Sequence, residues 1–139
     1  MLGFASVCEC GENGENYDFL GILEESHCSF FAVADGKGVP DASQIVLNTM
    51  MEDMKANAEV TTSTLPKCFE HAQAVLEEFQ KESMLPGGCA AAVLLTDGDV
   101  ALWGHIGDAR IYHLQDGLLY DITPDHSEAY TLYEAGGIR

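Results

Sequence analysis

The residues with the clearest chemical potential are an aspartate and a glycine that follow an apolar stretch. Residues 30–34 are Phe, Phe, Ala, Val and Ala, as in a buried strand, and Asp35 and Gly36 come directly after them. A carboxylate at a strand end, with flexible backbone beside it, can direct its oxygens and a carbonyl towards a hard cation such as Mg²⁺ or Mn²⁺. Because the same dipeptide is usually only a turn, the pair alone is a weak signal.

Two further Asp-Gly pairs occur later in the chain, at Asp97-Gly98 and Asp116-Gly117. Each stands between two apolar stretches, which is typical of a hairpin turn. A turn explains both pairs fully. A hairpin turn therefore does not explain the third Asp-Gly pair, Asp35-Gly36.

Four short motifs, which follow one another along the chain, strengthen the metal hypothesis. They are residues 16–19 (NYDF), 31–38 (FAVADGKG), 104–112 (GHIGDARIY) with Asp116-Gly117 after it, and 119–127 (LYDITPDHS). Together they resemble the type 2C metal-dependent serine/threonine protein phosphatases (PPM family) in a bacterial-like form, over nearly the whole chain. The Gly-Asp-x-Arg and Asp-His-Ser segments are the most specific part of this resemblance.

The resemblance implies both a fold and a chemistry. The fold is α+β, an antiparallel β-sandwich flanked by helices in four layers, of which this chain would supply roughly half. The chemistry is hydrolysis of phosphoserine or phosphothreonine by water that two divalent metals, Mg²⁺ or Mn²⁺, activate. By motif position, Asp35 matches the carboxylate that bridges both metals, Gly36 the residue that lends a carbonyl, and Asp18 the aspartate that helps to hold metal-bound water.

The other matched positions imply structural roles. Asp108 and Arg110 are expected to pin a tight turn between strands, and His126 is expected to be a hydrogen-bonded structural residue. The remaining histidines show no ligand spacing, so we interpret them as surface or hydrogen-bonded residues. They are His27, His71, His105 and His113.

The chain departs from the family pattern at positions that matter for catalysis. Tyr17 stands where the family has a metal-binding Glu or a Gln, and a phenol is a poor Mg²⁺ ligand at neutral pH. The upstream Arg that would hold the substrate phosphate has no counterpart, since Glu12 and Glu15 occupy that segment and repel phosphate. Two downstream aspartate motifs of the family are also unmatched. Because Mg²⁺ requires six oxygens, we expect weak metal binding at best.

These departures leave two functional readings open. In the first, the chain is the amino-terminal part of a phosphatase that acts on a phosphoprotein, and it is inactive by itself. In the second, it is a noncatalytic relative that serves as a binding or regulatory module for a protein partner, which Tyr17 and the missing Arg favour. A small acidic domain with a convergent Asp35-Gly36 pair is a third alternative. Whether Glu15 compensates for Tyr17 is left open.

Composition excludes several classes of function. The 139 residues include six Lys and Arg against 23 Asp and Glu, for a formal charge of -17, and 47% are hydrophobic. So few cations cannot neutralise nucleic-acid phosphates or an anionic membrane surface. The longest apolar run, residues 89–95, is far shorter than the ~20 residues of a membrane span. We expect a cytoplasmic protein in which the five cysteines, without a Cys-x-x-Cys pair, are buried free thiols.

Periodicity predicts the elements that must position these residues. We expect strands over 2–7 and 29–34, a loop over 11–16, and helices over 40–56 and about 65–82. A meander of four strands follows over 89–96, 100–106, 110–114 and 118–122. A final short helix is expected over 127–134, before Gly136-Gly137.

The organisation predicts one partial phosphatase-like domain over residues 1–139, because no repeat or linker interrupts the chain. Half of a two-sheet sandwich exposes apolar strand faces and unpaired edges. We therefore expect self-association, most simply as a symmetric homodimer.

Overall fold

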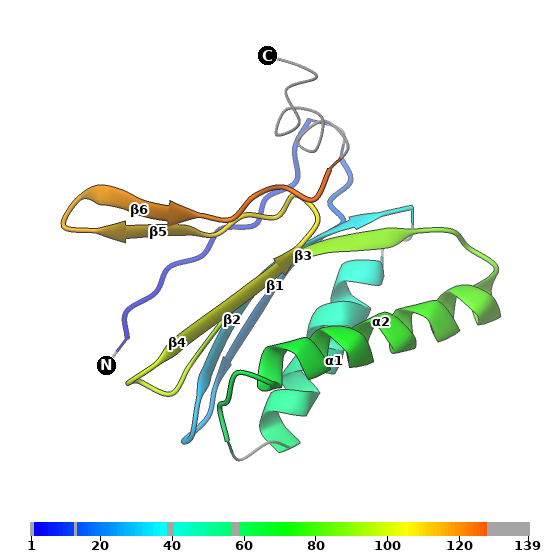
Figure 1. Ribbon diagram of the computed structural model, residues 1–139. Helices are drawn as coiled ribbons and strands as arrows, with labels where there is room; N and C mark the ends of the chain where they lie inside the picture. The colour runs from blue at the N-terminus through cyan, green and yellow to red at the C-terminus, as the bar shows by residue number, and fades with distance from the viewer. Residues whose placement is uncertain (1, 13, 39–40, 57–58, 128–139) are drawn as a thin grey trace.

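The described residues form a four-stranded antiparallel sheet, with two helices packed on one of its faces, and a separate two-stranded hairpin (Figure 1). This computed structural model describes residues 2–12, 14–38, 41–56 and 59–127. In chain order the elements are β1 (Asp18–Glu24), β2 (Ser29–Lys37), α1 (Ala42–Ala56), α2 (Thr64–Ser83), β3 (Gly88–Thr96), β4 (Ala101–Ile106), β5 (Tyr112–Gln115) and β6 (Leu118–Ile122). The α+β class predicted from the sequence is confirmed.

The core lies between the helices and the sheet. Four strands pair in the order β1-β2-β3-β4, and alternate residues of β2 and β3 point to the helices. Phe30, Val93 and Leu95 are fully buried there, against Leu47 and Met50 of α1. Neither α1 nor α2 lies over the opposite face of the sheet, as Figure 1 shows.

Both long helices occur where the apolar periodicity predicts them. α1 begins at Ala42. α2 ends at Ser83 and is followed by the C-cap residue Met84, whose φ of 57° is the left-handed conformation typical of this position. The predicted first residue of α1, Pro40, and residues 128–134 of the predicted final helix lie outside the described residues. No helix in the described parts of the chain is long and apolar enough to cross a membrane.

At the amino end, one predicted strand is wrong and one observed strand was not predicted. Residues 2–7 form no strand, although Phe4 packs on Phe31 with their ring centroids 5.3 Å apart. β1 was not predicted, because Gly21 interrupts its apolar pattern. The structure explains this glycine: a Cβ at Gly21 would lie 3.3 Å from the Leu47 side chain, so its absence lets α1 approach the sheet.

The four strands predicted after α2 all occur, but the prediction that they form one meander was wrong. β3 and β4 belong to the main sheet, whereas β5 and β6 pair with each other as a hairpin. The chain leaves the main sheet at Gly107, whose φ of 79° redirects it away from β3. The Asp116-Gly117 turn is confirmed, because both residues have the positive φ of the favoured two-residue hairpin turn.

The cysteines follow the prediction only in part. All five are free thiols; Cys28 and Cys68 are buried and Cys89 is half-buried, but Cys8 and Cys10 are exposed. The two exposed thiols belong to the segment before β1, which lies outside the helix-covered core.

Candidate metal centre

The structure brings the two predicted carboxylates together. Asp18 and Asp35 are direct cross-strand partners in the β1–β2 ladder. Side chains alternate along strands, so both residues share the face of Leu20 and Val33, opposite the helices. They line a cavity of about 280 Å³, together with the segment around Cys8 and with Ala109 from the β4–β5 connection.

The electrostatics of the pair fit a cation. Desolvation by burial raises the pKa of Asp35 above its usual value, and the charge and hydrogen bond of Asp18 raise it further. The charge of Asp108 acts in the same direction, and Lys37 opposes it. A hard divalent ion beside Asp35 would offset these unfavourable contributions and accept carboxylate oxygens as ligands. These two carboxylates therefore suit Mg²⁺ or Mn²⁺ chemically.

The donor set is nevertheless small. Across the residues that the structure describes, no three His, Cys, Asp or Glu side chains are grouped so that they could hold a metal ion. Two carboxylates leave most of an octahedral shell to water. Weak metal binding therefore stays a prediction.

Replacing Asp35 by Asn is expected to stabilise the metal-free fold at pH 7. Since the folded-state pKa of Asp35 is raised, its ionised form opposes folding, and the advantage of Asn shrinks as pH falls through that raised pKa. Thermal unfolding of wild type and Asp35→Asn at several pH values measures the difference.

Asp97 provides a control with the opposite sign. Backbone hydrogen bonds, first from Val100 and then from Asp99, lower the pKa of Asp97, so its ionised form stabilises the fold above its unfolded pKa. Asp97→Asn should therefore be less stable than wild type at pH 7, with the loss vanishing in acid. An Asp35→Asn variant that is less stable than wild type at every pH would contradict the expected stabilisation.

Gly36 lies within β2 and not after a strand end, because β2 continues to Lys37. Its N–H donates to the carbonyl of Tyr17 at 3.1 Å, and the buried Ser43 hydroxyl donates to the same oxygen. A Cβ at Gly36 would lie 3.1 Å from that carbonyl. The backbone beside Asp35 is thus fixed by contacts among β1, β2 and α1, while the metal-ligand role of the Gly36 carbonyl stays a prediction.

Tyr17 and Glu15 interact with each other. The Tyr17 hydroxyl donates to Oε2 of Glu15 at 3.0 Å, and this hydrogen bond with the nearby charge raises the pKa of the phenol. The phenol is therefore held in its neutral form, which is a poor ligand for a hard cation. Asn16 accepts a hydrogen bond from the Asp18 N–H at 3.0 Å, which fixes the start of β1.

The Gly-Asp-x-Arg and Asp-His-Ser motifs meet at a second cluster. Nε and Nη2 of Arg110 donate to the two carboxylate oxygens of Asp125 at 2.7 and 2.6 Å, and the pKa of Asp125 is lowered by this contact. Arg110 thus pairs with Asp125, while the expected role of Asp108 at the turn stays a prediction. The pair ties the β4–β5 connection to the segment after β6, a nonlocal contact that motif spacing does not reveal.

His126 has the structural role expected of it. Its N–H donates to the Gly107 carbonyl at 2.8 Å, and its Nδ1 accepts from the Gly107 N–H at 3.3 Å. The ring stacks on His105 with centroids 4.3 Å apart. The other four histidines make hydrogen bonds or ring contacts, with Met54, Asp53, Pro124 and Trp103 for His27, His71, His105 and His113 respectively.

Comparisons with known proteins agree with the motifs. No protein-family model matches the chain. A probable protein phosphatase 2C of Caenorhabditis elegans is 30% identical over 129 residues, which are 85% of this chain and 36% of that protein. The catalytic domain of the serine/threonine phosphatase PstP, solved with two manganese ions, matches with a TM-score of 0.73 and 26% identity over 89% of this chain. The phosphatase MsPP of Mycobacterium smegmatis, solved with cacodylate, matches with 26% identity and a TM-score of 0.71.

These matches cover most of this chain but only part of each relative. The chain spans about a third of the curated relative and 55% of the PstP chain. In sequence and in fold, the chain thus resembles the PPM family of serine/threonine protein phosphatases, and its α+β structure corresponds to about half of that family's domain.

Proposed function

We propose that this chain supplies part of the active site of a metal-dependent protein serine/threonine phosphatase, with Asp35 and Asp18 on the metal side of the site. The observation that carries the proposal is the cross-strand pairing of these two aspartates, with the pKa of Asp35 raised by burial and by Asp18. The likeness to PstP, which was solved with two manganese ions, supports Mn²⁺ or Mg²⁺ as the cation.

The residues divide the chemistry between them. When bound, divalent metals lower the pKa of a water molecule and neutralise the phosphoryl oxygens of phosphoserine or phosphothreonine. Asp35 would supply carboxylate oxygens to the metal, and Asp18 would accept a hydrogen bond from metal-bound water. Gly36 would offer its carbonyl from backbone that Tyr17 and Ser43 hold in place. Neither Lys nor Arg lines the described cavity, so the cavity itself offers a substrate phosphate no cation, although Lys37 is near enough to act on Asp35.

A noncatalytic relative is the second candidate, and the Tyr17–Glu15 hydrogen bond favours it. This contact occupies the position at which the resemblance implies a metal-binding Glu. The chain would then be a regulatory module that binds a protein partner with the same fold. For either candidate we propose a cytoplasmic location, from the formal charge of -17 and the lack of a basic membrane-binding surface.

Calorimetric titration with Mn²⁺ tests the metal proposal. We expect wild type to bind with a dissociation constant on the order of millimolar, because most of the ligand shell is water. Asp35→Ala should abolish the heat of binding, whereas Asp99→Ala, which removes an equal charge from the β3–β4 turn, should leave it unchanged. Tight Mn²⁺ binding by wild type, or equal binding by Asp35→Ala, would refute the proposed metal centre. The noncatalytic binding module would then be the remaining candidate.

A further inference from the structure

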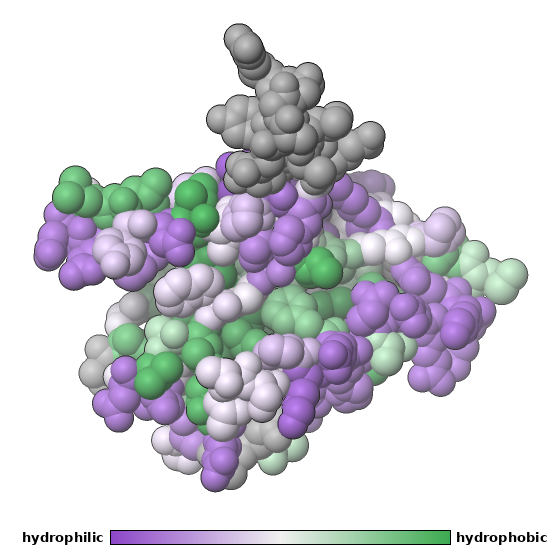
Figure 2. Space-filling view, viewed as in Figure 1, coloured by the Kyte–Doolittle hydropathy of each residue, from purple (hydrophilic) through white to green (hydrophobic). Residues whose placement is uncertain are grey.

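Ser43 is a buried polar residue in the first turn of α1. It is 1% exposed, the lowest value among the buried polar residues that the structure describes. Figure 2 shows hydrophobic residues gathered between the sheet and the helices, so a hydroxyl buried on this side of the sheet needs a specific partner. That partner is the carbonyl of Tyr17, to which the Ser43 hydroxyl donates. Ser43 therefore connects α1 to the start of β1, beside the candidate metal centre.

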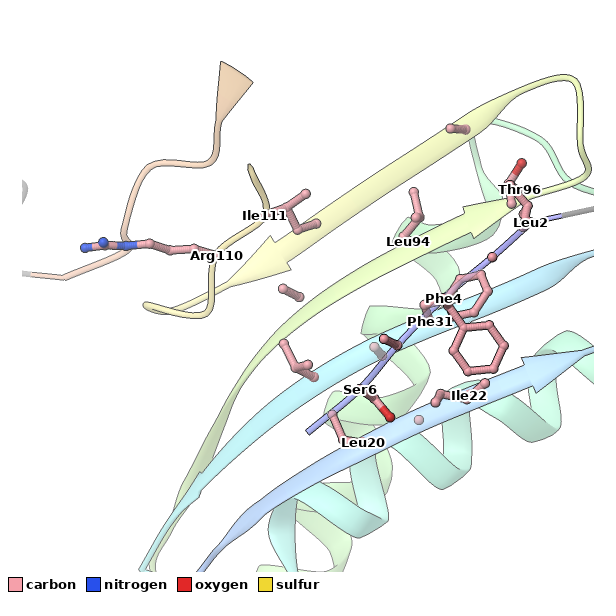
Figure 3. A pocket seen from close by; sticks show the side chains of 17 residues that line it. Leu2, Phe4, Ser6, Leu20, Ile22, Phe31, Leu94, Thr96, Arg110 and Ile111 are labelled. Atoms are coloured by element: carbon pink, nitrogen blue, oxygen red, sulfur yellow. The ribbon is translucent and has the colours of Figure 1, made fainter. Parts of the chain in front are cut away.

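The Asp35-Gly36 pair places its two residues on opposite faces of the sheet. Figure 3 shows a pocket on the face turned away from the helices, lined by Leu20 of β1 and Phe31 of β2 among others. The register puts Asp18 and Asp35 on that same face, because side chains two or four residues apart along a strand share a face. Gly36 is buried on the other face, against α1.

Gly36 leaves the space in which Ser43 reaches the Tyr17 carbonyl. A Cβ at Gly36 would lie 3.1 Å from that carbonyl oxygen, 3.4 Å from Oγ of Ser43 and 3.5 Å from the Ser43 nitrogen. The first two atoms are the acceptor and the donor of the Ser43–Tyr17 hydrogen bond, so a larger residue would press directly on that bond. The glycine of the pair thus has a packing role besides the carbonyl that the resemblance assigns to it.

The peptide between Tyr17 and Asp18 is held on both sides. Its carbonyl accepts from the Ser43 hydroxyl and, at 3.1 Å, from the Gly36 N–H, while its N–H donates to Oδ1 of Asn16 at 3.0 Å. Asp18 belongs to the last pair of the β1–β2 ladder, so the Tyr17–Gly36 hydrogen bond lies just beyond the ladder. Such ends open easily. A second donor from α1 on the same carbonyl keeps this end closed.

We propose that Ser43 is a positioning residue of the metal centre. By holding the Tyr17 carbonyl, its hydroxyl keeps Asp18 opposite Asp35, so that both carboxylates act on one cation. This inference rests on the metal centre proposed above. Ser43 does not itself bind the cation, because it packs against the helix face of the sheet and the carboxylates occupy the other face.

Removing the Ser43 hydroxyl should weaken metal binding about tenfold, as loss of a group that orients metal ligands typically does. Titration with Mg²⁺, followed by the amide NMR signals of Asp18 and Gly36, measures the dissociation constant. The ionic strength is kept constant with NaCl, because a chain of formal charge -17 also attracts cations nonspecifically. Asp35→Ala defines that nonspecific part.

Two further variants identify the hydroxyl as the cause. Thr49→Val removes a hydroxyl from the same helix, one that donates to the Ile45 carbonyl at 2.7 Å, and should leave Mg²⁺ binding unchanged. Ser43→Thr keeps the donor and should bind Mg²⁺ like wild type. Far-ultraviolet circular dichroism checks folding, and Ser43→Cys, with a similar volume and a weak donor, replaces Ser43→Ala if the latter fails to fold.

Hydrogen exchange in the metal-free protein tests the same contact without a cation. The Gly36 amide should exchange about tenfold faster in Ser43→Ala than in Thr49→Val, because the end of the ladder opens more often. The Phe31 amide, from the middle of the β1–β2 ladder, should exchange at similar rates in the two variants.

The outcomes separate the role of Ser43 from the proposed centre. Mg²⁺ binding that needs Asp35 but is unchanged in Ser43→Ala would overturn the role of Ser43 alone. Binding by wild type that equals that of Asp35→Ala would overturn both the centre and this role. Equally weak binding by Ser43→Ala and Ser43→Thr, or equal Gly36 exchange in Ser43→Ala and Thr49→Val, would also overturn the positioning role.

Discussion

The 139-residue chain is expected to release no phosphate above background from a phosphothreonine peptide, even in millimolar Mn²⁺. Two-metal catalysis requires both cations to be held against the attacking and leaving oxygens. Here the described residues offer the Asp18–Asp35 pair and no group of three or more ligating side chains. Because enzymes accelerate such reactions by many orders of magnitude, loss of the second metal should bring turnover to an undetectable level.

The assay needs three proteins and one blank. Wild type, Asp35→Asn and Tyr17→Glu are compared with Mn²⁺ alone by release of inorganic phosphate. Tyr17→Glu restores a carboxylate at the position where the resemblance implies a metal ligand, so it should tighten Mn²⁺ binding. It should not by itself produce turnover, because no Lys or Arg lines the described cavity to hold phosphate. Robust Mn²⁺-dependent hydrolysis that Asp35→Asn abolishes would refute the expectation and the noncatalytic reading.

Gly107→Ala should destabilise the fold by about 2 to 4 kcal/mol, a large part of the ~5 to 15 kcal/mol typical of a domain. Gly107 has a φ of 79°, where any Cβ is strained. A Cβ there would also lie 2.8 Å from the Ala90 Cβ and 3.3 Å from its Cα, which is backbone that cannot move aside. Both the N–H and the carbonyl of Gly107 bond His126, so the strain falls on the contacts that fix the chain after β6.

Gly117→Ala is the matched control. Gly117 has nearly the same φ, 78°, but an added Cβ would meet nothing within 4 Å. Its substitution should cost about 1 kcal/mol from backbone strain alone. Urea unfolding of both variants therefore separates the conformational cost from the clash with Ala90. Equal stabilities for the two variants would show that the β4–β5 turn rearranges freely, contrary to this prediction.

Features that depend on neighbouring residues were predictable from the sequence. The spacing of Val46, Leu47 and Met50 predicts α1, and the structure buries all three. Asp116-Gly117 predicts a hairpin turn, and both residues have positive φ. The family resemblance also came from local motifs, and the comparisons confirm it.

Features that depend on pairing across the chain were not predictable in the same way. Residues 2–7 have the composition of a strand, yet they form none. β1 forms by pairing with β2 although it contains Gly21, whose missing Cβ leaves room for Leu47 of α1. Arg110 was expected to pin a turn between strands, but the sequence did not reveal its partner Asp125, to which its guanidinium donates two hydrogen bonds. In each case a long-range contact overrode the local pattern.

The sequence by itself determined the two helices, the hairpin turns, the candidate aspartates and the resemblance to a phosphatase family. Their causes are short-range: apolar residues three or four apart, glycine at positive φ, and motif residues a few positions apart. The tertiary structure alone decided that Asp18 faces Asp35, that β5–β6 leaves the main sheet, and that the Ser43 hydroxyl reaches the Tyr17 carbonyl. Strand register sets the first of these, because one residue of slip would turn Asp18 and Asp35 to opposite faces and abolish the shared electrostatics.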